Sequence, residues 1–122
     1  MKSVILDTNF ILSCIRKKID FFTEIKGRGI KILIPEEVIK EIKNLSEEGN
    51  KNLQEEAKIA SQILKNNSFE IIVLNTKNVD NGIVKIAKEN PEYIIGTLDK
   101  EIKNKIKNQK LIIRGEKHLE IS

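Results

Sequence analysis

The chain has 122 residues, of which 39% are hydrophobic and 33% charged, and its formal net charge is +4. This length suits one hydrophobic core, so a single domain over residues 1–122 is predicted, and the composition excludes a disordered chain. No apolar run approaches the roughly 18 residues of a membrane span, and the only cysteine, Cys14, excludes an intramolecular disulfide. We therefore expect a soluble cytoplasmic protein without a membrane partner.

Along the chain, five short runs rich in β-branched residues alternate with helical patterns. The runs cover residues 4–6, 31–34, 70–74, 93–95 and 111–114. The helical patterns cover residues 8–16, 19–26, a third helix from residue 35 to the break at residues 49–50, and then 53–65, 79–89 and 98–107. Strands that alternate with helices predict right-handed crossovers and a parallel sheet covered on both faces. The predicted class is α/β, with three α/β/α layers.

The triplet Asp7-Thr8-Asn9 follows the first strand-like run directly. In α/β proteins, binding and catalytic residues gather at the carboxyl ends of parallel strands, so a carboxylate here is placed for a cation or a reacting group. Asp, Thr and Asn are also favoured helix N-caps, which is the structural alternative.

In the third helix, Val38 and Ile42 belong to the predicted buried stripe. At about 100° per residue, Glu41 lies at the margin of this stripe, whereas Glu37 lies further round the helix. An acid at the margin can reach a site and still keep some of its water. The alternative is a boundary glutamate that pairs with a neighbouring lysine.

Two further acids flank the fourth strand-like run. Asp80 stands at the start of the fifth helix, on the side of its apolar face, and Asp99 follows Thr97 after the strand. Each has a structural alternative, because Asp80 is a candidate N-cap, Thr97 can cap the sixth helix, and Asp99 is a favourable first-turn acid.

Together, these acids point to one site. If the first and fourth strands are neighbours, a switch point lies between them and the acids converge there. Carboxylates in one cleft repel one another unless a cation compensates, and all-oxygen ligands indicate Mg²⁺ or Mn²⁺. Such a site suits phosphodiester hydrolysis. The predicted catalytic and metal-binding acids are Asp7, Glu41, Asp80 and Asp99, with Asn9 and Thr97 supporting them by hydrogen bonds.

The chain resembles the PIN-domain family of metal-dependent ribonucleases over nearly its full length. Four short motifs carry the resemblance, in the family's order and spacing. They are Asp7-Thr8-Asn9 after the first strand, Glu41 in the helix after the second, Asp80 with Ile83 and Ala87, and Thr97-Leu98-Asp99.

The resemblance implies a five-stranded parallel sheet in the order 3-2-1-4-5 and endonucleolytic cleavage of RNA. It implies a homodimer as the family habit. The tail from Leu111 to Ile121 is similar to archaeal single-domain proteins related to a ribosomal-RNA-processing endonuclease, which implies a ribosome-assembly partner. Those proteins often carry two adjacent aspartates at the third motif, where this chain has Asp80-Asn81. VapC-type toxins, whose partner is an antitoxin, share the acid quartet.

Three other classes of protein are alternatives to this interpretation. A phosphatase of the haloacid dehalogenase type needs a second aspartate where this chain has Asn9, and no glycine-rich loop follows a strand as nucleotide binding would require. An RNA-binding scaffold that no longer cleaves is the non-enzyme alternative.

Overall fold

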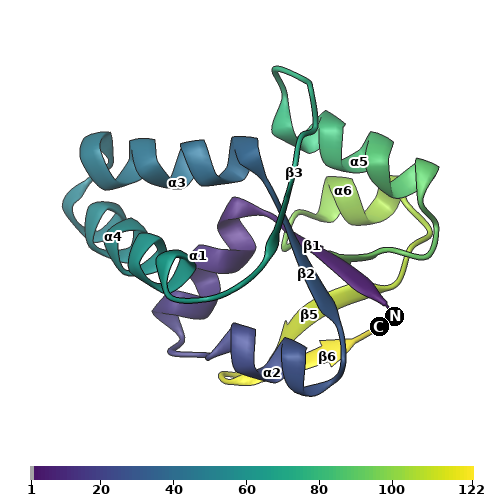
Figure 1. Ribbon diagram of the computed structural model, residues 1–122, viewed down its shortest axis with the longest axis horizontal. Helices are drawn as coiled ribbons and strands as arrows, with labels where there is room; N and C mark the ends of the chain where they lie inside the picture. Colours follow the sequence, from purple (N-terminus) through teal and green to yellow (C-terminus); the bar gives the residue numbers. More distant parts are fainter. Residues whose placement is uncertain (1) are drawn as a thin grey trace.

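The computed structural model describes residues 2–122, which fold into one sheet with helices on both faces (Figure 1). The strands are β1 (Ser3–Leu6), β2 (Lys31–Pro35), β3 (Glu70–Ile72), β4 (Ile94–Gly96), β5 (Lys110–Arg114) and β6 (His118–Ile121). The helices are α1 (Thr8–Arg16), α2 (Phe21–Gly27), α3 (Glu36–Glu48), α4 (Lys51–Lys65), α5 (Val79–Glu89) and α6 (Lys100–Lys105).

The sheet order is β3-β2-β1-β4-β5-β6, and every neighbouring pair is parallel except β5 with β6. The predicted order of the first five strands is confirmed, but the prediction of five strands was wrong by one. The sixth strand forms because Gly115, at a φ of +65°, turns the chain back on itself and Arg114 then pairs with His118. Glycine adopts this backbone conformation without steric cost.

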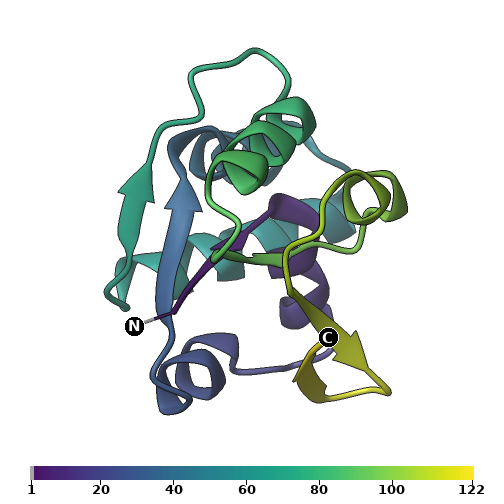
Figure 2. The same cartoon turned by 90° about the vertical axis from the view of Figure 1, so that its right-hand side faces the viewer.

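Two hydrophobic clusters fill the space on either side of the sheet, as the alternation of side chains along a strand requires. Val4 and Leu6 of β1 face the larger cluster, which α1, α2, α3 and α4 cover, and Cys14 is buried there. Ile5 faces the smaller cluster beneath α5 and α6. Figure 2 shows these two helices together on one side of the sheet. Two of the four predicted site acids, Asp80 and Asp99, lie at the N-terminal ends of these two helices.

Three helices begin or end at other residues than predicted, and the side chains that cap them explain most of these differences. Asp20 and Asn50 cap α2 and α4, which therefore begin at Phe21 and Lys51. The sixth helix is shorter than predicted, because Asp99 caps its start and the buried Ile106 leaves it in an extended conformation. The longest helix formed by residues 2–122 is α4, with 15 residues, and none of those helices is long and apolar enough to cross a bilayer.

Candidate active site

Asp7 is fixed at the junction of β1 and β4. Its backbone N–H donates to the carbonyl of Gly96 at 3.1 Å, which extends the pairing of the two strands by one residue. Its carboxylate caps α1 by accepting from the Phe10 N–H at 2.8 Å and accepts a second hydrogen bond from the Thr97 hydroxyl. With 6% of its surface exposed, Asp7 is held by both strands at the switch point of the sheet.

Thr97 joins two of the predicted acids. Its buried hydroxyl donates to Asp7 and accepts from the Asp99 N–H at 3.1 Å. Asp99 itself caps α6, because its carboxylate accepts from the Glu101 N–H at 2.8 Å. The alternative that placed Thr97 at the cap and Asp99 in the first turn was therefore wrong. The cap fixes one oxygen of Asp99 and leaves the other unused by it.

Asp80 lies in the first turn of α5 but does not cap it. Asn78 is the N-cap, and its side chain accepts from the Asn81 N–H at 3.0 Å. The alternative in which Asp80 serves as the cap was therefore wrong, and its carboxylate is exposed. Because the Asp80 carboxylate does not cap the helix, its oxygens are available to bind a ligand.

Glu41 from α3 and Asp80 from α5 line one pocket of about 330 Å³. Asp7 and Thr8, at the start of α1, line the same pocket, and Leu12 contributes an apolar side chain to it. A neighbouring pocket of about 340 Å³ is lined by Asp99, Ser13 and Arg16. Asn9 lines both pockets, so the two hollows adjoin at this exposed side chain. The structure thus brings the four predicted acids to the two hollows around the start of α1.

The acids act on one another electrostatically. Burial raises the pKa of the Asp7 carboxyl from 3.8 to about 6 against two hydrogen bonds that lower it, and the charges of Asp80 and Asp99 raise it further. Burial also raises the pKa of Asp80, with Asp99 and Glu41 adding to the effect. Mutual repulsion of this kind indicates a site that favours positive charge.

The side chains present fit a hydrated divalent cation. Among residues 2–122, no three His, Cys, Asp or Glu side chains are gathered closely enough to ligate one ion together. Mg²⁺, however, keeps several waters and is usually bound through one or two carboxylates, which this arrangement can supply. The donors are all oxygens, as this class of ion prefers. The Thr8 hydroxyl is also buried at the pocket wall without a hydrogen-bond partner among the described residues.

Three features of the site were missed by sequence reasoning. Glu101 raises the pKa of Asp80 and Lys105 lowers it, so both belong to the field of the site. No sequence pattern marked them, because at about 100° per residue both lie on a different face of α6 from Asp99. Glu37, judged to lie away from the site, uses its carboxylate to bind the backbone after β3. Asn9 makes no hydrogen bond to an acid among residues 2–122, so the structure shows the predicted supporting bond for Thr97 alone.

The chain is similar in sequence and in fold to known proteins. The PIN like domain family matches residues 4–114. Ribonuclease VapC4 of Methanocaldococcus jannaschii is 26% identical over 127 aligned residues, which cover 99% of this chain and 97% of that protein. The solved structure of the PIN domain endonuclease Utp24 superimposes with a TM-score of 0.76 at 26% identity, covering 98% of this chain and 90% of that chain. A domain of a functionally unknown protein from Methanocaldococcus jannaschii shares the fold, with a TM-score of 0.51 at 24% identity over 85% of this chain and 83% of that one.

Proposed function

Because this chain belongs to the PIN-like domain family, we propose that it is a Mg²⁺- or Mn²⁺-dependent endoribonuclease that hydrolyses RNA phosphodiester bonds. The observation that carries the proposal is the place of Asp7. This buried carboxylate sits at the switch point between β1 and β4 and feels the charges of Asp80 and Asp99. The names of the two relatives, a ribonuclease and an endonuclease, support the same reaction class.

In the proposed site, Asp7 and Asp99 are the most rigid cation ligands. The Thr97 hydroxyl holds Asp7 directly and the Asp99 backbone through its N–H, so the two acids keep a constant separation. A bound divalent ion supplies a water of lowered pKa and charge stabilisation for the leaving oxygen. Asp80 completes the anionic wall from α5.

Glu41 has a different part in the proposal. Its side chain is exposed on α3 and lines the same pocket as Asp80, so it can reach the cation or accept a hydrogen bond from the attacking water. At the junction of the two hollows, the exposed amide of Asn9 is placed to donate to a phosphate oxygen. The Thr8 hydroxyl, which lacks a partner within residues 2–122, gains one from a ligand in the pocket.

For the biological role we propose RNA processing, including processing of ribosomal RNA, in the cytoplasm. The likeness to the PIN domain endonuclease Utp24 over nearly the whole chain supports the endonuclease activity that this role needs. The likeness to Ribonuclease VapC4 favours the second candidate, a toxin ribonuclease controlled by an antitoxin. A homodimer is part of either proposal.

The test is cleavage of a labelled single-stranded RNA by the wild-type chain and by Asp7→Asn, with Mn²⁺ and with EDTA. We expect cutting that needs the metal and is lost in the variant. Asp20→Asn is the matched control, since it makes the same change at an exposed helix cap and Asn caps as well as Asp. Cutting by Asp7→Asn at the wild-type rate would refute the site. A wild-type chain that binds RNA but never cuts it would indicate the scaffold function instead.

A further inference from the structure

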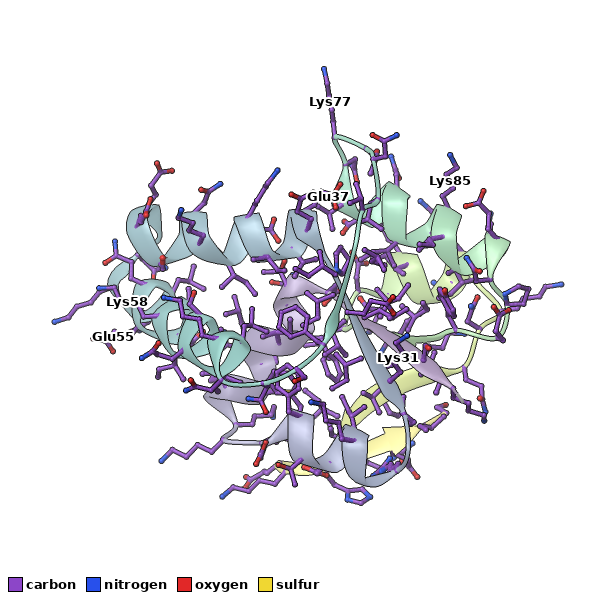
Figure 3. The ribbon with its side chains drawn as sticks, in the orientation of Figure 1. Lys31, Glu37, Glu55, Lys58, Lys77 and Lys85 are labelled. Atoms are coloured by element: carbon purple, nitrogen blue, oxygen red, sulfur yellow. The ribbon has the colours of Figure 1, made fainter. Side chains whose placement is uncertain are left out.

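Two acids stand one helical turn apart on α3 and have different partners. Glu41 lines the acidic pocket. Glu37, at the beginning of the helix, accepts hydrogen bonds from two consecutive backbone amides, Leu74 N–H to Oε1 at 3.1 Å and Asn75 N–H to Oε2 at 3.0 Å. Figure 3 shows Glu37 at the end of α3 nearest to the segment that follows β3. One carboxylate thus joins two elements that are far apart in sequence.

The segment held by Glu37 lies beyond the regular pairing of the sheet. Strand β3 ends at Ile72, and no helix begins before Val79. Within this connection, Val73 is 59% exposed and Asn75 has a φ of +56°, an uncommon conformation for a residue other than glycine. The two hydrogen bonds that the Leu74 and Asn75 amides donate to Glu37 therefore replace the pairing that a longer strand would have given.

The same segment packs against the first turn of α5. A Cβ atom added at Gly82 would lie 2.5 Å from Cγ2 of Thr76 and 2.9 Å from Cβ of Leu74. Such distances leave no free space between the segment and the helix. A shift of the segment therefore moves the beginning of α5, and Asp80 lies two residues before Gly82.

We propose that Glu37 is a positioning residue that sets the separation of Glu41 and Asp80 across the acidic pocket, by holding the backbone of Leu74 and Asn75 against α5. It fixes α3 to the segment, and the segment fixes α5, so the two walls of the pocket move together. The inference rests on the proposed function, in which both acids face a divalent cation.

The experiment uses the full chain without RNA and measures two quantities for each variant. One is the exchange rate of the Leu74 and Asn75 amides. The other is the Mn²⁺ dissociation constant, measured by calorimetric titration. Glu37→Ala should lose about tenfold or more of its amide protection and bind Mn²⁺ about tenfold more weakly or worse. Glu37→Gln keeps one acceptor oxygen, so its amide protection and its Mn²⁺ affinity should fall between those of the wild type and those of Glu37→Ala. It also replaces Glu37→Ala as the test variant if Glu37→Ala does not fold.

Glu36→Gln is the matched control, because this neighbouring acid makes a surface pair with Lys40 at 3.7 Å and no other salt bridge or side-chain hydrogen bond within residues 2–122. It should leave both quantities unchanged. Lost amide protection with wild-type Mn²⁺ affinity would make Glu37 a purely structural residue and refute the inference, while the proposed function would stand. Unchanged protection of the Leu74 and Asn75 amides in Glu37→Ala would show that Glu37 does not hold this backbone, and it would refute the inference as well. If the wild-type chain does not bind Mn²⁺, the proposed site and this inference fail together.

Discussion

Replacing Asp7 with Asn should stabilise the protein at neutral pH when no divalent cation is present. The wild-type carboxylate is buried beside other acids, and these surroundings raise its folded-state pKa to about 6 from an ordinary value of 3.8. The folded state therefore binds this proton more tightly than the unfolded state does. The contribution of Asp7 to stability is complete below about pH 3.8 and is lost as the pH rises through about 6.

The size of the effect follows from the two pKa values. They differ by about 2.2, and each pKa unit corresponds to about 1.4 kcal/mol, so ionised Asp7 costs the folded state about 3 kcal/mol. Asn removes the charge and keeps one carbonyl oxygen for the Phe10 amide, but it turns an NH₂ group towards Thr97. We therefore expect a gain of about 1–3 kcal/mol in the free energy of unfolding.

The assay is urea unfolding in EDTA at about pH 4 and about pH 8, comparing Asp7→Asn with the wild type at each pH. The variant should gain stability at the higher pH and show little or no gain at the lower, where wild-type Asp7 is largely protonated. Asp20→Asn should change little at either pH. A gain of equal size at both pH values, or a loss at the higher one, would refute the electrostatic argument.

Adding Mn²⁺ should reverse the order of stability. A cation that binds only the folded wild type stabilises it by about 4.1 kcal/mol at a thousandfold excess over Kd, which exceeds the advantage of about 1–3 kcal/mol expected for the variant, and Asp7→Asn should lack most of this metal-induced stabilisation. Equal metal-induced shifts in the two proteins would show that Asp7 is not a ligand.

Three further changes test the packing and the hydrogen bonds that the structure describes. Gly82→Ala should lose about 1–3 kcal/mol by overpacking, measured by thermal unfolding, whereas Gly27→Ala, with open space at its Cβ position, should not lose stability. Thr97→Val should raise the pKa of Asp7 further by removing a hydrogen bond that lowers it, which carboxyl NMR titration can measure; an unchanged pKa would contradict the described bond. Asn108→Ala should cost about 2–4 kcal/mol in urea unfolding, because its buried amide donates to three backbone carbonyls, and a loss under about 1 kcal/mol would mean that water replaces them.

The alternation of strands and helices predicted a parallel sheet covered on both faces, whereas the order of the strands came from the resemblance to the PIN-domain family, because alternation alone does not determine which strands are neighbours. Residues 8–16 and 79–89 were predicted as helices with the bounds that the structure has, since each has a clear apolar face and end signals. The strand at residues 118–121 was not predicted, because a four-residue run after a tight turn has no periodicity long enough to recognise. Its pairing depends on the neighbouring β5.

The sequence could show which residue of each helix or strand end is a candidate for the site, but it could not show which side chains contact one another. That Asp7 follows a buried strand is local information. The hydrogen bond that Thr97 donates to Asp7 spans 90 residues, and the bonds donated to Glu37 by the Leu74 and Asn75 amides span 37 and 38. Helical phase alone separated Glu37 from Glu41, but it could not show that a loop from beyond β3 would lie over Glu37.

The last strand bears on how the chain can be shortened. The family match ends at Arg114, whereas β6 begins at His118 and covers the outer side of β5. A chain cut after residue 114 would expose the backbone of β5, a five-residue strand, as an unpaired edge. Unpaired edges of this kind associate with other chains and aggregate. The opposite edge, β3, is only three residues long and carries the exposed Lys31–Glu70 ion pair between β2 and β3, so it is the better protected of the two. The final eight residues therefore help to keep the protein soluble, although they contribute no acid to the site.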